Sequence, residues 1–382
     1  MEDVFMKVMI KLNKGQALNN ILQGFVDLEI IGFFADSQKF WGHSYDGVSV
    51  YSLYEAVQMY ERNAVDKFIL NGDFPAATIQ AKAHELQAFN VRREDILIAT
   101  QDFSDKTAWD CIYPIDHYGR LPYLEFHVTD HCNMNCKGCV HFSPLVKGEV
   151  FPLYTEIEKD LRQLHSLVPY IDMIRIMGGE PFLNKELENY LDLVRQIYPM
   201  SAISVVTNGL LLKSISNKLV ASFIRNNVSI NVSLYPPLLP QMQDIMREIT
   251  SKGIKISCSE PIQEFAYALD AQEGHALHAN RINCTCPNLY KGALYVCPII
   301  AYLRYFNKAF HERLDDQDGR IDIYDPQLTF PRLAGELHKV RKLCDRCLFI
   351  SREHAELKKW ERTDAAVIWD YMRMNLATGK RG

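Results

Sequence analysis

The chain has 382 residues, 48% of them hydrophobic and 23% charged, so it is long enough for two or three packed domains and disorder is not expected. A formal net charge of −5 argues against a nucleic-acid-binding surface. No run of eighteen apolar residues occurs, and the first twelve residues do not place an apolar core after a basic stretch, so neither a membrane span nor a secretory signal is predicted. We therefore expect a cytoplasmic protein with no nucleic-acid or membrane partner.

The first 115 residues alternate short apolar stretches with helical ones. Strands are predicted at 7–10, 28–35, 48–51, 67–70 and 96–99. Helices are predicted at 16–23, between the third strand and Arg62, and at 76–89. This alternation predicts a Rossmann-like α/β domain over 1–115. The domain contains no G-x-G-x-x-G sequence, so dinucleotide binding is not expected. Residues 109–119, which include Cys111, are interpreted as a linker.

The chain contains ten cysteines, which are expected to be thiols or metal ligands because no secretory signal is predicted. Three of them, Cys132, Cys136 and Cys139, form a C-x3-C-x2-C run. Thiolates suit iron–sulfur clusters, and three of them leave one iron of a [4Fe–4S] cluster without a protein ligand. A structural zinc loop is the alternative, but its fourth ligand is missing nearby. The spacing therefore favours a cluster with an open iron, where chemistry can occur.

Strands and helices repeat regularly around this run. A strand is predicted at 121–128, before the cysteines, and a second at 173–177 ends in the sequence G-G-E-P at 178–181. Further strands are predicted at 203–206, 228–232 and 254–256, with helices at 155–167, 185–197, 214–225 and 240–252. Such a pattern predicts a parallel sheet covered by helices, whose site lies at the carboxyl ends of the strands. The polar or thiol residues at those ends are Thr207, Asn208, Ser233 and Cys258.

The C-x3-C-x2-C run followed by G-G-E-P resembles the radical S-adenosylmethionine (SAM) superfamily. The resemblance implies a partial (β/α)6 barrel, here over 116–275, with a [4Fe–4S] cluster on Cys132, Cys136 and Cys139 and SAM at the open iron. It also implies a flavodoxin- or ferredoxin-type electron donor. Reductive cleavage of SAM would then give a 5′-deoxyadenosyl radical that removes hydrogen from a substrate.

The same resemblance implies where SAM is held. The backbone at the glycines and the glutamate of G-G-E-P would meet the amino group of SAM, and the ends of the third and fourth strands its carboxylate and ribose. Glycine is suited to such close approach, whereas threonine and asparagine after a strand are equally typical of an ordinary turn. The residues concerned are Gly178, Gly179, Glu180, Thr207, Asn208 and Ser233.

One position departs from the pattern of the superfamily. The residue before the last cluster cysteine is usually aromatic and packs on adenine, whereas it is Gly138 in this chain. The Gly138 carbonyl is still expected to meet the adenine amino group. The stacking surface must come from elsewhere, and His141 and Phe142 are the nearest candidates.

Four further cysteines form a second pattern. Residues 284–298 are predicted to form a hairpin that turns near Gly292, with cysteine at each end, and a C-x2-C pair follows at 344–347. This arrangement is similar to the Twitch domain, a shortened SPASM domain that binds an auxiliary [4Fe–4S] cluster, here over 276–350. The first cysteine lies closer to the glycine than is usual there, and zinc on the four thiolates is the chemical alternative. The expected ligands are Cys286, Cys297, Cys344 and Cys347, with Cys284 as the substitute for Cys286.

The last part of the chain, 351–382, is predicted to be a helix followed by a tail. Apolar residues recur at helical spacing between 351 and 374. This helix is expected to pack against the barrel.

The predicted activity is that of a radical SAM oxidoreductase with a small polar substrate, such as a sugar or a nucleotide-linked sugar. The Rossmann-like domain and the missing peptide-recognition module favour this over a peptide-modifying maturase, which is the alternative, as is a zinc-binding scaffold without activity. Arg175 would offer a charge to a phosphate or carboxylate, although a structural role is equally expected. Oxidation would pass the second electron to the auxiliary cluster. Epimerisation would need a thiol hydrogen donor, for which Cys258 is the candidate, although a lone cysteine is more commonly just buried.

Overall fold

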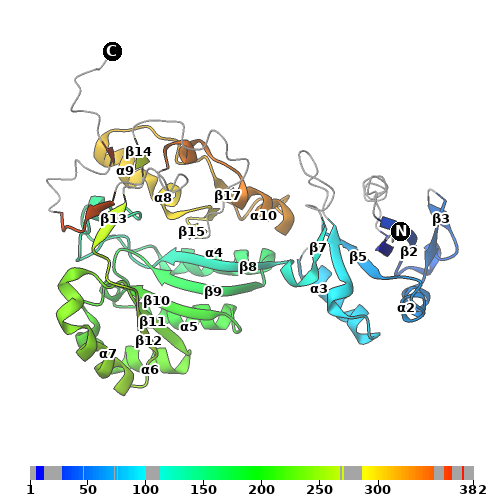
Figure 1. Cartoon of the computed structure of the whole chain (residues 1–382), viewed down its shortest axis with the longest axis horizontal. Helices are drawn as coiled ribbons and strands as arrows, with labels where there is room; N and C mark the ends of the chain where they lie inside the picture. Colours follow the sequence, from blue (N-terminus) through cyan, green and yellow to red (C-terminus); the bar gives the residue numbers. More distant parts are fainter. Residues whose placement is uncertain are drawn as a thin grey trace, which may run out of the picture. The chain divides into compact units, whose positions relative to one another are not determined.

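The chain folds into two compact units, seen in the computed structural model of Figure 1. The first comprises Met1–Arg120 with Ser166–Pro169 and Gln327–Ala334, and the second the rest. The structure describes residues 6–12, 28–45, 47–72, 74, 76–99, 112–266, 269–270, 286–347, 357–363 and 372–373. Within these residues, none of the helices combines the length and the apolar character needed to cross a bilayer.

The first unit contains a seven-stranded sheet in the order β3-β4-β2-β1-β5-β6-β7. Strands β4, β2, β1, β5 and β6 pair in parallel, and the chain order reverses between β1 and β5. This is a doubly wound, Rossmann-like arrangement, as predicted. The strands are β1 Met6–Lys11, β2 Leu28–Phe34, β3 Ser44–Tyr45, β4 Val48–Tyr51, β5 Lys67–Asn71, β6 Ile96–Ala99 and β7 Ile112–Pro114.

Two helices of this unit follow their predicted positions, α2 at Leu53–Glu61 and α3 at Ala76–Ala88. Helix α2 begins with a capping box, in which the Ser52 hydroxyl accepts from the Glu55 N–H and the Glu55 carboxylate accepts from the Ser52 N–H. The predicted helix at 16–23 and Cys111 lie outside the described residues.

The second unit contains an eight-stranded sheet in the order β12-β11-β10-β9-β8-β15-β16-β17. Strands β9, β10, β11 and β12 pair in parallel, and β8 lies beside β9. The sheet stays open, as in a partial barrel. The strands are β8 Arg120–His127, β9 Tyr170–Met177, β10 Ala202–Thr207, β11 Val228–Val232, β12 Ile256–Cys258, β15 Asn288–Tyr290, β16 Ala293–Tyr295 and β17 Arg320–Asp322.

Helices follow the first four of these strands, which confirms the predicted alternation: α4 at Tyr154–Leu167, α5 at Leu187–Ile197, α6 at Asn217–Arg225 and α7 at Met242–Ser251. Among the described residues, five strands in chain order, β8 to β12, build the partial barrel where six units were predicted. On the far side of β8, the sheet continues into β15 instead.

The two faces of this sheet have different surroundings. On β9, Ile174 and Ile176 are fully buried, whereas Arg175 and Met177 are half-buried. Because side chains alternate along a strand, the isoleucines pack under the helices, and Arg175 and Met177 lie on the opposite, inner face. The inner face is therefore the one that leads to the carboxyl-end cavity described below.

The hairpin predicted at 284–298 is confirmed for its described part. Strands β15 and β16 are antiparallel, and the two residues between them, Lys291 and Gly292, have φ of 44° and 73°. Two successive positive φ angles are those of a tight hairpin turn, which favours glycine. Strand β15 pairs in parallel with β8, with Asn288 opposite Glu125, so the hairpin extends the sheet of the partial barrel. Helices α8 Pro298–Ala301, α9 Leu303–Phe310 and α10 Phe330–His338 follow in the chain.

The predicted helix between 351 and 374 is wrong for the residues that the structure describes there. Leu357–Lys359 form strand β18, which is antiparallel to β13 at Glu264–Ala266. A second short pair joins β14 at Leu269–Asp270 to β19 at Met372–Arg373. Apolar spacing is a local signal, and here pairing with a strand more than ninety residues earlier in the chain outweighs it.

Candidate active site

The cysteine loop begins after β8 and packs against the G-G-E-P turn after β9. The Gly179 N–H donates to the Thr129 carbonyl at 2.9 Å, and the Glu180 N–H donates to the His131 carbonyl at 3.1 Å. A Cβ atom on Gly178 or Gly179 would lie 2.1 Å from one of these carbonyl oxygens. The glycines thus allow the two loops to touch, a role in addition to the predicted approach to a ligand.

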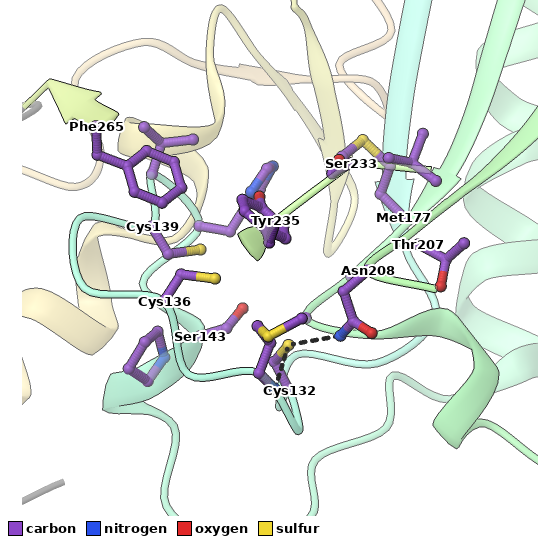
Figure 2. A pocket seen from close by; sticks show the side chains of 17 residues that line it. Cys132, Cys136, Cys139, Ser143, Met177, Thr207, Asn208, Ser233, Tyr235 and Phe265 are labelled. Atoms are coloured by element: carbon purple, nitrogen blue, oxygen red, sulfur yellow. Dashed lines mark hydrogen bonds between the residues drawn. The ribbon is translucent and has the colours of Figure 1, made fainter. Parts of the chain in front are cut away.

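The carboxyl ends of the strands surround a cavity of about 170 Å³, shown in Figure 2. The sulfur atoms of Cys136 and Cys139 point toward the space in front of Asn208. The structure therefore brings together residues that were predicted from three separate stretches of sequence. The predicted residues that line the cavity are Cys132, Cys136, Cys139, Gly178, Gly179, Thr207, Asn208 and Ser233.

Glu180 was predicted to contact SAM, but its carboxylate does not line this cavity. It is fully buried and accepts hydrogen bonds from the Thr207 hydroxyl at 2.7 Å, the Asn208 N–H at 2.8 Å and the Phe182 N–H at 3.1 Å. Burial raises the pKa of Glu180 to about 7, against these hydrogen bonds. The carboxylate fixes the end of β10 and so positions residues that do line the cavity.

Asn208 connects that strand end to the cysteine loop. Its side-chain amide donates to the Asn133 side chain at 2.7 Å and to Cys132 Sγ at 3.6 Å, as the dashed line in Figure 2 marks. The Met134 N–H also donates to Cys132 Sγ, at 3.3 Å. Burial raises the pKa of the Cys132 thiol to about 11, so the sulfur needs such donors, or a metal, to be held as a thiolate.

His141 places a positive charge beside the cysteine loop. Burial lowers its pKa, but Cys139 and Glu125 outweigh burial and raise it to about 10. Glu125 lies on β8, 3.7 Å from His141 Nε2, and accepts a hydrogen bond from the Asn288 side chain on β15 at 3.2 Å. The hairpin thereby helps to hold a cationic imidazole next to the cysteines, which favours the thiolate form that binds metal.

An aromatic side chain of strand β13 lies beside Gly138. Gly138 has φ of 88°, and a Cβ atom there would lie 3.2 Å from Phe265 Cβ. Phe265 lines the cavity, and so does Tyr235, whose ring centroid is 5.9 Å from that of Phe265. Of the predicted candidates, His141 also lines the cavity, whereas Phe142 does not.

Neither Phe265 nor Tyr235 was identified from the sequence. Phe265 lies 127 residues beyond the glycine whose missing side chain it replaces, and no motif marks it. Phe142 packs into the core instead, with its ring centroid 5.5 Å from that of Phe306. Gly138 has a positive φ, which few residues other than glycine adopt. The glycine itself is therefore the one local signal that another part of the chain supplies the aromatic side chain.

Cys258, the candidate hydrogen donor, is the last residue of β12. It pairs with Val232, which is fully buried, whereas the neighbouring pair joins Asn231 and Ser257. The cysteine is not among the residues that line the cavity, so its role as a hydrogen donor stays a prediction.

The cysteines of the second pattern lie around the hairpin and α10. Cys286 precedes β15, Cys297 is the residue before α8, and Cys344 Sγ accepts from the Arg341 N–H at 3.4 Å. Cys347 follows within the same turn, and Cys284 lies outside the described residues. In the described part of the chain, no three His, Cys, Asp or Glu side chains are grouped to hold a single metal ion.

Comparison with known proteins identifies the central segment. Residues 126–258 match the family model described as the Radical SAM superfamily. This segment belongs to the radical SAM superfamily. It contains the three cysteines, the G-G-E-P turn and the strand ends around the cavity. Membership implies a [4Fe–4S] cluster and SAM as cofactors.

Relatives and solved structures resemble only part of the chain. The GTP 3′,8-cyclase of Sulfurimonas denitrificans is 32% identical over 153 residues, covering 37% of this chain and 47% of that protein. The GTP 3′,8-cyclase of Pelotomaculum thermopropionicum is 34% identical over 172 residues, covering 44% of this chain and 48% of that protein. The chain thus spans about half the length of these curated relatives. The crystal structure of BtrN in an open conformation is 17% identical, with a TM-score of 0.34 over 59% of this chain and 92% of that one.

The residues around the cavity fit the implied cofactors. Three thiols line it, and a buried polar atom beside them, Ser143 Oγ, has no hydrogen-bond partner among the described residues. Buried polar groups are normally paired, so this atom fits a polar or charged group in the cavity. Cys132, Cys136 and Cys139 would hold the cluster, and Asn208 and Ser233 lie on the side where SAM would bind.

Proposed function

We propose that this radical SAM enzyme oxidises a small, polar, anionic substrate. The observation that carries the proposal is the meeting of three cysteine thiols, the two glycines of G-G-E-P and the polar ends of β10 and β11 around one cavity. Cys132, Cys136 and Cys139 would hold a [4Fe–4S] cluster, which would supply the electron for cleavage of SAM and so the means to remove a hydrogen atom from the substrate. The chain binds, orients and shields these groups.

The cavity residues divide between the two ends of SAM. Asn208 and Ser233 present an amide and a hydroxyl for its carboxylate and ribose, and the backbone at Gly178 and Gly179 lies beside the cysteine loop where its amino group would sit. Phe265 offers the flat surface for adenine. Each of these groups is fixed by strand pairing or by Glu180, so SAM would meet a site that is already formed.

Arg175 supports an anionic substrate. It lies on the inner face of β9, two residues before the cavity-lining Met177 and opposite Ser204 of β10. Its guanidinium lies 5.3 Å from the ring centroid of Tyr123, and no carboxylate of the described residues forms an ion pair with it. A guanidinium in this position is suited to a phosphate or carboxylate. Nucleotides and nucleotide-linked sugars carry such groups, and the name of the relatives, GTP 3′,8-cyclase, includes a nucleotide.

Oxidation requires that the substrate radical lose a second electron and a proton. We propose that Cys286, Cys297, Cys344 and Cys347 would hold an auxiliary [4Fe–4S] cluster, which would supply an acceptor for that electron. Cys258 is not among the residues that line the cavity, which supports oxidation over epimerisation, because epimerisation needs a hydrogen donor at the substrate. A flavodoxin- or ferredoxin-type protein would supply the first electron.

A second candidate is ring closure on a nucleotide, which the name of the relatives, GTP 3′,8-cyclase, favours. Anaerobic incubation with SAM, dithionite and candidate substrates tests both. Nucleotides or nucleotide sugars should increase the release of 5′-deoxyadenosine, while short peptides should not. Mass spectrometry should show a product two mass units lighter for oxidation and of unchanged mass for ring closure. Stimulation by peptides alone would contradict the proposed substrate class, and iron-free, zinc-loaded protein would indicate a scaffold.

An Arg175→Gln variant sharpens the test. The KM of the stimulating substrate should rise about 10- to 100-fold, because a charge-assisted contact is lost. The slow release of 5′-deoxyadenosine without substrate should stay unchanged. Equal KM values for Arg175→Gln and the wild type would contradict the anion-binding role.

A further inference from the structure

A short segment near the carboxyl end of the chain lies against the cysteine loop. We call residues 360–363 the strap. The Lys137 N–H donates to the Glu361 carbonyl at 2.9 Å, and the Thr363 N–H donates to the Asn135 carbonyl at 2.8 Å. These residues are more than 220 positions apart in the sequence, so the contact is tertiary and not part of the local loop fold.

The strap is attached at the middle cysteine. Cys136 and Arg362 form an antiparallel β-bridge. The Arg362 guanidinium donates to the carbonyls of Met134 and Asn133, both at 3.1 Å. The strap therefore pairs with the backbone of the loop that carries the ligands and satisfies carbonyls that the loop itself leaves open.

Trp360 begins the strap and faces the cysteines. Its backbone N–H donates to the Gln263 carbonyl at 2.7 Å, and its ring stacks on Tyr235 with centroids 5.9 Å apart and an interplanar angle of 23°. The indole N–H is buried next to the Cys136 side chain, and it has no fully formed hydrogen bond to any of the described residues. The ring is thus fixed on two sides, with its donor beside the ligand.

A buried donor without a partner is unusual, and the chemistry of sulfur explains it here. A neutral thiol is a weak acceptor, whereas a thiolate bound to iron carries negative charge and accepts more strongly. Cys132 already receives donors from Met134 and Asn208. Trp360 is placed to do the same for Cys136 once the cluster is bound.

We propose that the strap fixes the cysteine loop and that Trp360 Nε1 donates a hydrogen bond to the cluster-bound sulfur of Cys136, which raises the reduction potential of the cluster. The reduced cluster carries one more negative charge than the oxidised cluster, and a donor to sulfur stabilises that charge. Trp360 is a positioning and tuning residue and does not contact substrate. The inference rests on the bound cluster and not on the proposed substrate or on oxidation.

The test compares Trp360→Phe with the wild type after anaerobic reconstitution to equal iron content. Phenylalanine keeps an aromatic ring against Tyr235 and removes the N–H. In a redox titration that follows the electron paramagnetic resonance signal perturbed by SAM, the ratio of reduced to oxidised cluster at a fixed potential should fall about tenfold, a shift of about 59 mV for one electron. The control is Trp41→Phe, which removes an indole donor to the Ala35 carbonyl in the first unit and should leave the potential unchanged.

Two further variants distinguish an effect on the reduction potential of the cluster from an effect on the stability of the cysteine loop. Arg362→Ala keeps the indole N–H but removes two contacts to the loop, so cluster loss to a chelator should accelerate while the potential stays near that of the wild type. If Trp360→Phe does not retain iron, the sulfur analogue of tryptophan, which keeps the bicyclic shape without an N–H, replaces it in the same titration. A potential equal to that of the wild type in the loaded variant would overturn the proposal, whatever the substrate proves to be.

Discussion

Polar side chains lie near the carboxyl ends of strands in both parallel sheets of this protein, but their surroundings differ. In the first unit, Lys11 at the end of β1 and Lys82 on α3 both pair with Asp36, at 2.6 and 2.7 Å, and Lys82 also pairs with Glu85, so these charges neutralise one another. In the second unit, Asn208 and Ser233 line a cavity. A polar strand end is thus a candidate binding site where a cavity opens in front of it, and a separate buried carboxylate, Glu180, keeps the cavity residues in place.

The largest expected effect is on a cluster ligand of the second unit. Cys136→Ala removes one of three thiolates, so reconstituted iron at this site should be lost and release of 5′-deoxyadenosine should fall at least about a thousandfold, about 4 kcal/mol in activation free energy. The matched control is Cys258→Ala, whose thiol does not line the cavity and whose loss should leave the release near wild type. Persistent 5′-deoxyadenosine from the Cys136 variant would contradict the assignment of the ligands.

The next effect concerns the contact between the two loops. Gly179→Ala would place Cβ 2.1 Å from the His131 carbonyl oxygen, so one loop must move and the free energy of unfolding should fall by about 3 kcal/mol or more. Gly148→Ala is the control: its Cβ meets nothing within 4 Å, and only its positive φ costs about 1 kcal/mol. Urea unfolding measures both. Equal midpoints would mean that the two loops do not constrain each other.

A pH effect isolates the buried carboxylate. Burial raises the pKa of Glu180 to about 7, so the folded protein binds this proton more tightly than the unfolded chain does. Its contribution is complete below about pH 4.5 and is lost as the pH rises to about 7, which lowers the free energy of unfolding by about 3 kcal/mol.

Urea titrations of the cluster-free protein at several pH values measure this slope. Glu180→Gln should flatten it, and Glu156→Gln, at an exposed position of α4, should not. An unchanged slope in Glu180→Gln would show that the carboxyl titrates normally and that the end of β10 is held by other contacts.

The smallest effect is expected in the first unit. Lys82→Ala breaks a contact with Asp36, whose side chain is 57% exposed, so the loss should be below about 1 kcal/mol. Release of 5′-deoxyadenosine should be unchanged. A large loss of activity in this variant would remove the contrast between the two sheets and would assign a functional role to the first.

Much of the site followed from local signals in the sequence. Cys132, Cys136 and Cys139 were identified by spacing, and Asn208 and Ser233 by their position after buried strands. Parallel pairing then brings those strand ends together without further information, because the carboxyl ends of parallel strands share one edge.

Other features depended on contacts that no local pattern encodes. The side of the sheet on which Cys258 lies is set by its pairing with Val232. The Glu180 carboxylate does not line the cavity because it accepts hydrogen bonds from three donors that only the folded chain brings together. Phe265 and Trp360 reach the cysteine loop from 126 and 221 residues beyond Cys139, through the pairing of β13 with β18. The apolar spacing near Trp360 predicted a helix because helical periodicity and a short buried strand look alike over few residues.

The account is tested most directly by the electron paramagnetic resonance spectrum of the reduced, reconstituted protein before and after SAM is added. If three cysteines leave one iron open beside Asn208 and Ser233, SAM binds that iron and the spectrum of the reduced cluster changes. A spectrum that is identical with and without SAM, in protein with full iron content, would contradict the claim that this cavity is where cluster and SAM meet.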